Sequence, residues 1–162
     1  MNYQWQTALF DALSGAELYA VLRLRQAVFV VEQRCVYLDL DDLDQAATHL
    51  LCREEGGRLA GYLRCLPPGL HYAESSLGRI VVDPAARGRY LGRELVQRGI
   101  RYNLEHWPGS GILINAQAYL RGYYTELGFA AEGDEYDEDG ILHVKMRYDP
   151  GSPAAIPFSP PG

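Results

Sequence analysis

A basic, glycine-containing stretch at residues 87–93 holds the side chains of this chain best suited to bind an anion. It reads Arg87-Gly88-Arg89-Tyr90-Leu91-Gly92-Arg93, follows the apolar residues 80–82, and opens directly into a predicted helix. The first N–H groups of a helix have no intrahelical partner and lie at the positive end of its dipole, which favours phosphate. The arginines add positive charge here although the whole chain carries a net charge of −6. The stretch therefore predicts a site for a polyphosphate.

Two common phosphate loops do not match this stretch. A Walker loop needs GxxxxGK followed by Ser or Thr, which the sequence lacks. A dinucleotide-binding fingerprint needs GxGxxG, and Gly88 and Gly92 do not have that spacing. The pattern instead resembles the pyrophosphate loop of the GNAT acetyltransferase superfamily, usually Arg/Gln-x-x-Gly-x-Gly/Ala.

A second segment strengthens this resemblance. Residues 112–116 are strand-like, and the helix predicted after them ends in Tyr123-Tyr124-Thr125-Glu126-Leu127-Gly128-Phe129. That ending is similar to the Phe/Tyr-Tyr-x-x-x-Gly-Phe of the superfamily, and the helix between the two segments also matches. Across nearly all of 1–149 the chain resembles the ElaA-like branch, whose signature stretches are similar to residues 27–33, 78–82, 116–120 and 138–146.

The resemblance implies a binding site for acetyl-CoA. In the superfamily two neighbouring parallel strands splay apart, here residues 77–82 and 112–116, and pantetheine inserts between them like an added strand. The residues then implied in binding are Ile80, Val81, Val82, Arg87, Gly88, Arg89, Tyr90, Leu91, Gly92, Arg93, Asn115 and Tyr124. One residue departs from the pattern, because bulky Tyr90 replaces the middle glycine of the loop. If its side chain points away from the groove, its N–H can still donate.

The resemblance also implies direct attack of an amine on the thioester, through a tetrahedral oxyanion. A backbone N–H near Val82 is the expected oxyanion donor, and Tyr124 is the expected acid that protonates the CoA thiolate. An alkylammonium with a pKa of about 10.4 must first lose a proton. Glu32, His49 and His143 are candidate bases, although each also fits a structural hydrogen bond. Tyr124 likewise fits a packed aromatic side chain.

The acceptor is not specified by the sequence. A small-molecule or peptide amine fits, and the acidic residues 38–44 either attract a cationic amine or form a solvated loop. Arg79 either orders an acceptor carboxylate or pairs with an acid. Two other functions remain open: a CoA-binding sensor or interaction module without turnover, and transfer of a different acyl group. The family also makes a homodimer possible.

Composition limits the other classes of function. The 162 residues are 48% hydrophobic and 22% charged, as in a soluble globular domain. The acidic balance argues against nucleic-acid binding, and the sequence contains no run of 18 apolar residues for a membrane span. No secretory signal is evident. Cys35, Cys52 and Cys65 form no CxxC pair, which predicts core thiols, no zinc site and a cytoplasmic location.

The elements that must position these residues follow from periodicity, caps and turns. Ser14 and Glu17 match a capping box. Helices are expected at about 15–31, 89–105 and 118–127, and strands at 3–9, 49–54, 58–66, 77–82, 112–116, 129–136 and 141–148. This order predicts an α/β or α+β domain at 1–149, with a mixed, mostly antiparallel sheet of about seven strands flanked by about four helices. The Pro-rich segment 150–162 predicts an extended or disordered tail.

Overall fold

The computed structural model describes residues 2–151 and contains one eight-stranded sheet. Its strand order is β1-β2-β3-β4-β5-β8-β6, and β7 pairs with β8. The strands are β1 Tyr3–Leu9, β2 Thr48–Glu54, β3 Leu59–Leu66, β4 Ser75–Val82, β5 Ile112–Gln117, β6 Ala130–Ala131, β7 Tyr136–Glu138 and β8 Ile141–Tyr148. The expected mixed, mostly antiparallel sheet is confirmed. The predicted tail lies outside the described residues from 152 onward.

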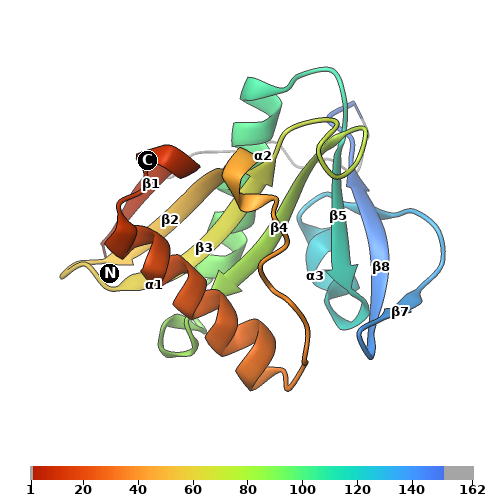
Figure 1. The fold of residues 1–162 in the computed structure, drawn as a ribbon. Coiled ribbons are helices and arrows are strands. Elements are labelled where there is room, and N and C mark those ends of the chain that lie inside the picture. Colours follow the sequence, from red (N-terminus) through yellow and green to blue (C-terminus); the bar gives the residue numbers. More distant parts are fainter. Residues whose placement is uncertain (1, 152–162) are drawn as a thin grey trace.

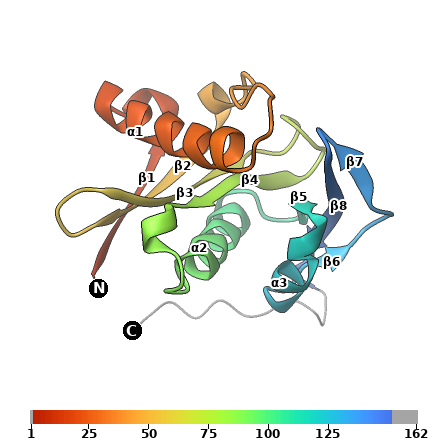
Figure 2. The ribbon, with the colours of Figure 1, turned by 90° about the horizontal axis from the view of Figure 1, so that it is seen from below.

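Helices cover both faces of the sheet (Figures 1 and 2). Helix α1, Gly15–Arg25, lies on one face and continues into a π-helical segment, Gln26–Glu32. Helices α2, Leu91–His106, and α3, Arg121–Glu126, lie on the other face. These three are the α-helices of the part of the chain that is described, and short 3₁₀ turns join the remaining elements. Among residues 2–151, none of the helices has the length and apolarity needed to cross a bilayer.

The start of α1 forms as its sequence predicts. The Ser14 hydroxyl accepts a hydrogen bond from the Glu17 backbone N–H at 3.0 Å. In return, the Glu17 carboxylate accepts from the Ser14 N–H at 2.8 Å, which completes the capping box. Apolar residues of α1 then pack on β2, β3 and β4, and a larger apolar cluster fills the space between the opposite sheet face and α2.

Strands β4 and β5 are the one parallel pair of the described sheet, and they separate almost at once. Only Ser75 pairs with Ile112, and Ser76 with Leu113. Asn103 of α2 fixes this point, because its buried side-chain amide donates to the Ser75 hydroxyl at 3.2 Å and to the Ser76 carbonyl at 3.1 Å. Beyond it the two strands diverge (Figure 1), so the splay expected at residues 77–82 and 112–116 is present.

A β-bulge turns β4 away from β5. Strand β3 pairs Arg64 with Gly78 and then Tyr62 with Val81, so β4 carries one extra residue between these pairs. Arg79 lies in this extra segment with a left-handed φ of 50°. Bulges of this kind bend a strand and increase its twist, which accounts for the divergence of β4 from its parallel neighbour.

The strand predicted at 129–136 is wrong in one respect, because it is divided into β6 and β7. Pairing continues past Ala131 only to Glu132, whose N–H donates to the Lys145 carbonyl at 2.8 Å. Gly133 then adopts a φ of 90°, which takes the chain out of the sheet. The chain returns as β7, and a tight turn with positive φ at Asp139 and Gly140 leads into β8.

Candidate active site

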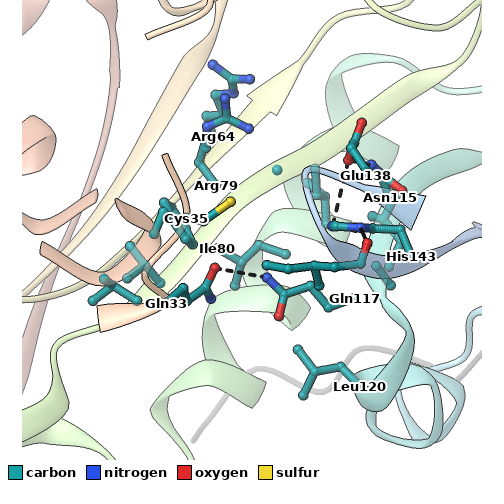
Figure 3. Close-up of a pocket in the computed structure, with 18 of the residues that line it drawn as sticks. Gln33, Cys35, Arg64, Arg79, Ile80, Asn115, Gln117, Leu120, Glu138 and His143 are labelled. Atoms are coloured by element: carbon teal, nitrogen blue, oxygen red, sulfur yellow. Dashed lines mark hydrogen bonds and ion pairs between the residues drawn. The ribbon is translucent and has the colours of Figure 1, made fainter. Parts of the chain in front are cut away.

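A cavity of about 780 Å³ opens where β4 and β5 diverge. Its walls come from these two strands, the π-helical segment after α1, the β3–β4 loop, and the β7–β8 hairpin. Figure 3 shows Gln33, Cys35 and Arg79 on one side and Asn115, Gln117 and His143 on the other. Ligand sites in proteins commonly enclose about 300–1,000 Å³, so the volume suits an extended arm together with a small second molecule.

The structure brings eight of the site residues expected from the sequence to this cavity. Its lining includes Glu32, Ile80, Val81, Val82, Arg87, Asn115, Tyr124 and His143. The other six, at residues 88–93, are not part of its lining. They form the loop before α2 and the first turn of that helix.

Two residues of the loop before α2 have a left-handed backbone conformation. Gly88 and Tyr90 both adopt left-handed φ values, 83° and 59°, a turn geometry that favours anion binding by successive N–H groups. The Tyr90 side chain is 84% exposed and therefore points away from the protein. Gly92 lies against α3, because a Cβ added there would approach the Tyr123 hydroxyl to 3.2 Å. Glycine at this position lets the first turn of α2 lie close to α3.

The arginines of this loop already have carboxylate partners. Arg87 makes a two-pronged contact with Glu32, at 2.7 and 3.1 Å. Arg93 lies 3.4 Å from Glu126, and Arg89 lies 4.0 Å from Glu54. All three arginine side chains are at least 38% exposed, and exposed pairs of this type contribute little free energy. A polyphosphate can therefore compete for these arginines at low cost.

Tyr124 is the buried residue of α3 and lines the cavity. The side chain is 6% exposed and packs edge-on against Tyr123 and Phe129. Burial raises the pKa of the Tyr124 phenol above its ordinary value. The hydroxyl is therefore protonated at neutral pH, as a proton donor must be.

His143 lies on the opposite wall of the cavity, in β8. Its Nδ1 lies 2.8 Å from the Ile141 carbonyl oxygen. A carbonyl can only accept, so Nδ1 donates, and Nε2 of the neutral ring keeps a free lone pair. Nε2 lies 3.7 Å from a carboxylate oxygen of Glu138 in β7. The same oxygen accepts a 2.7 Å hydrogen bond from the Asn115 amide.

His49 has a structural role and is not among the cavity-lining residues. The ring is fully buried, with Nδ1 2.6 Å from the Tyr62 hydroxyl and Nε2 2.9 Å from the Asp44 carbonyl oxygen. Burial lowers the pKa of His49 more than its hydrogen bond to the Asp44 carbonyl raises it. Both ring nitrogens are thus occupied inside the protein, which removes His49 from the candidate bases.

The acidic loop at 38–44 is tied to three arginines. Arg25 is fully buried and contacts Asp39 at 2.8 Å and Asp44 at 2.7 Å. Two further arginines, Arg64 and Arg79, complete this buried arginine–aspartate network: Arg64 contacts Asp44 and Asp41, and Arg79 contacts Asp39 and Asp41. The carboxylates of Asp39, Asp41 and Asp44 are paired within the fold, so the expected attraction of an amine by Asp41 and Asp44 has no support, while Asp42 is exposed. Of the two roles open for Arg79, pairing with an acid is the one observed.

Several residues of the cavity wall were not anticipated. Glu138 borders it next to His143, while His71, Tyr72 and Cys35 close other parts of its surface. A hydrogen bond of 3.2 Å from Gln117 to Gln33 spans the cavity (Figure 3). The Asp139-Gly140 turn was a usable signal for Glu138, because a two-residue turn fixes the register and sets Tyr136 opposite His143.

The architecture and cavity define the class of protein. The fold resembles that of an acyl-CoA N-acyltransferase from Pseudomonas aeruginosa, with a TM-score of 0.86, 39% identity, and coverage of 91% of this chain and 100% of that one. Escherichia coli ElaA is similar in structure, with a TM-score of 0.85, 35% identity, and coverage of 91% and 100%. Together with the splayed strands, these likenesses support acyl-CoA N-acyltransferase activity.

The chain belongs to the GNAT acetyltransferase family. The model of the acetyltransferase (GNAT) domain matches residues 22–150. A UPF0039 protein of Synechocystis sp. is 42% identical over 148 residues, which is 91% of this chain and 95% of that protein. The sequence of E. coli ElaA is 37% identical over 145 residues, 88% of this chain and 94% of ElaA. The resemblance to the ElaA-like branch is thereby confirmed.

Proposed function

We propose that this protein is an acetyl-CoA-dependent N-acetyltransferase that acts on a primary amine by direct transfer. The observation that carries the proposal is the cavity at the β4–β5 divergence. It brings a protonated phenol, Tyr124, and an imidazole, His143, to the walls of one compartment in a GNAT chain. Acid and base chemistry can then act on the two sides of one thioester.

The acyl donor fits the wedge between the strands. Past Ser76 the edge of β4 that faces β5 has no strand partner in residues 2–151, so the backbone at 80–82 is available to pair with pantetheine amides. The N–H groups at 88–93 and the side chain of Arg87 are suited to the pyrophosphate. A backbone N–H near Val82 is suited to the oxyanion.

The proton balance assigns a role to each side chain. The acceptor ammonium gives one proton to Nε2 of His143, and the free amine attacks the thioester carbonyl carbon. As the C–S bond breaks, the thiolate takes the proton of the Tyr124 hydroxyl. The second amine proton passes to solvent water as the amide forms, the Tyr124 phenolate regains a proton from solvent, and His143 releases its proton to solvent. Glu32 is the less suitable base, because both of its oxygens accept from Arg87.

Two measurements test this proposal. Calorimetry with CoA and acetyl-CoA measures binding of the donor, and release of free thiol measures turnover with a panel of amines and peptides. We expect CoA binding together with amine-dependent thiol release. CoA binding without release for any acceptor would identify a CoA sensor instead, and release from longer acyl-CoA thioesters alone would identify another acyl group.

A further inference from the structure

One carboxylate in the cavity, Glu138, has no role in the proposed transfer. It lies at the end of β7, and its side chain is 49% exposed, so an entering molecule can reach it. One of its oxygens, Oε2, accepts from the Asn115 amide at 2.7 Å. The other oxygen, Oε1, has no hydrogen-bond partner within the described range 2–151. The carboxylate is thus held from one side and open on the other.

Glu138 and His143 present two acceptors to the same point. Nδ1 of His143 donates to the Ile141 carbonyl, so in the unprotonated ring it is Nε2 that carries the lone pair. This nitrogen lies 3.7 Å from Glu138 Oε2, which is also an acceptor. While the ring is unprotonated, these two groups are both acceptors, and a donor is needed between them. A primary ammonium, with three N–H groups and a positive charge, satisfies both at once.

Other groups near Glu138 favour a cation. Tyr136 stacks on the His143 ring at 6.3 Å, and the Glu138 charge, added to burial, raises the pKa values of Tyr136 and Tyr72. The pKa of His71 is lowered by burial and by the charge of Arg64, and Glu138 acts in the opposite direction. The ring face of Tyr72 already holds a cation, because the Lys145 ammonium lies 5.1 Å from its centre. Asp139, the next residue, adds negative charge at the same cavity wall.

The side-chain amide of Asn115 makes one hydrogen bond at each end, to Glu138 and to Tyr136. Its amide N–H donates to Glu138, and its carbonyl oxygen accepts from the Tyr136 hydroxyl. One N–H and one lone pair of the amide are engaged in this way, and one of each remains. Asn115 is thus placed to orient the carboxylate, and the cofactor-binding role that the sequence resemblance implied stays a prediction.

We propose that the Glu138 carboxylate receives the ammonium group of the acceptor and holds it where it gives a proton to Nε2 of His143, with Asn115 as the positioning residue. This inference rests on the proposed acetyltransferase function and names the residue that recognises the charge of its acceptor. The substrate is a primary ammonium whose charge is recognised, and it enters beside the β7–β8 hairpin.

The test uses CoA-saturated protein, which cannot turn over, and two probes of the same shape. 2-Phenylethylammonium carries the charge, and 2-phenylethanol is its neutral counterpart. We expect wild-type protein to bind the ammonium about tenfold or more tightly than the alcohol, since hydrogen bonds to charged groups are the stronger ones. Glu138→Gln should abolish this preference, whereas Glu135→Gln, an exposed carboxylate outside the cavity lining, should retain it.

Asn115→Ala separates a positioning role from a cofactor role. We expect it to weaken ammonium binding about fivefold to tenfold while the Kd for CoA changes less than about twofold. A CoA Kd raised as much as the ammonium Kd would restore Asn115 to the cofactor site. Equal binding of the two probes by wild-type protein would overturn the ammonium site. Amine-dependent thiol release in that case would leave the proposed function standing, whereas loss of CoA binding would remove both.

Discussion

Tyr124 is the residue on which the proposed chemistry depends most directly. Its pKa is raised by burial, which keeps the phenol protonated but makes it a weaker acid, so proton transfer has to accompany C–S cleavage. We expect Tyr124→Phe to lower kcat about 100-fold, the usual range for loss of a positioned acid. The Kd for CoA should stay within about twofold, because the ring and its packing remain.

The matched control for this substitution is Tyr19→Phe. Tyr19 is 71% exposed on α1 and does not line the cavity, so both constants should be unchanged. Steady-state thiol release and calorimetry measure the two quantities. An equal loss of kcat and of CoA affinity in Tyr124→Phe would point to a packing role instead.

The three thiols differ in where they lie. Cys52 and Cys65 are at most 1% exposed in the apolar core, and burial raises the pKa of Cys52 to about 12. Cys35 borders the cavity, where its thiol contacts the Asp139 carbonyl at 3.4 Å. Because the thiolate is the reactive form, N-ethylmaleimide should modify Cys35 first. Bound CoA should slow that reaction about tenfold, if it fills a site of the usual affinity.

Peptide mass spectrometry after timed quenching identifies which thiol reacts. A Cys35→Ser variant is the control, and it should lose the fast phase completely. Labelling of Cys52 or Cys65 ahead of Cys35 would contradict the assignment of Cys35 to the cavity wall. So would a labelling rate of Cys35 that CoA does not change.

At the scale of single elements, the loop before α2 tolerates a tyrosine at the position where the superfamily pattern has glycine. Tyr90 takes a left-handed conformation that costs a non-glycine residue about 1–2 kcal/mol. Tyr90→Gly relieves that cost but also increases the conformational entropy of the unfolded chain. We expect the free energy of unfolding to rise by less than about 1 kcal/mol. The CoA Kd should change less than about threefold, since the side chain points outward.

Denaturant titration and calorimetry measure these two quantities for Tyr90→Gly. Tyr119→Gly is not a suitable comparison, because Tyr119 lies in a 3₁₀ turn with no left-handed φ. Tyr90→Ala is the better control, because it removes the ring and keeps the cost of the left-handed conformation. A tenfold tighter CoA complex in Tyr90→Gly alone would mean that the backbone of the wild-type loop is strained away from the phosphates.

Much of the element order could be predicted because the signals are local. The capping box at Ser14, the glycine after α3, and the apolar strand before the phosphate loop each depend on a few neighbouring residues. The bulge at Arg79 could not be predicted, since it depends on how β3 and β4 align across the sheet. The break at Gly133 depends likewise on where β8 stops accepting hydrogen bonds.

The residues of the candidate site also fall into two groups: those that local sequence patterns predict, and those that depend on how the strands come together. The motif resemblance identified Tyr124 and His143 as candidates because their segments have a recognisable pattern. It did not identify Glu138, which is one acid among several in a hairpin. The contacts that single out Glu138 are made by residues of β5 and β8. The resemblance also gave Arg87 and Glu32 separate roles, although the fold pairs them across 55 residues of sequence.

At the scale of the whole molecule, the buried arginine–aspartate network joins α1, β3, β4 and the loop before β2. Removing one partner leaves the others charged and buried. We expect Arg25→Ala to lower the free energy of unfolding by about 3–5 kcal/mol, the range for breaking buried pairs. Arg23→Ala is the matched control, because Arg23 lies on the exposed side of the same helix and should cost less than about 1 kcal/mol. Urea titration measures both, and similar losses would contradict the structural role of the network.

Stability should also fall in acid, for two reasons with the same sign. His49 has a folded pKa below its ordinary value of 6.5, so the unfolded state binds its proton first and stability declines as pH drops below 6.5. Burial alone would raise the pKa of Asp41 and Asp44, but Arg64 and Arg25 outweigh it and lower both below 3.8. Their contribution is complete above 3.8 and is lost as the pH falls through the folded values.

Urea titrations between pH 8 and pH 5 measure the first of these declines. His49→Gln should flatten most of it, leaving the smaller share of His71, whose pKa is also lowered by burial. His106→Gln, at an exposed position near the end of α2, should leave the profile unchanged. A wild-type protein equally stable at pH 8 and pH 5 would show that His49 titrates normally.

The early divergence of β4 and β5 has one more consequence, which concerns self-association. Open strand edges invite other chains to add to a sheet, and proteins usually protect the outermost ones. Here two open edges lie in the middle of the sheet, facing each other across a wedge that narrows to the Ser75–Ile112 pair. A strand from a second molecule would have to thread into that wedge past α1 and α3. The recess thus admits a slender, flexible ligand while excluding the flat β-sheet partner that would start aggregation.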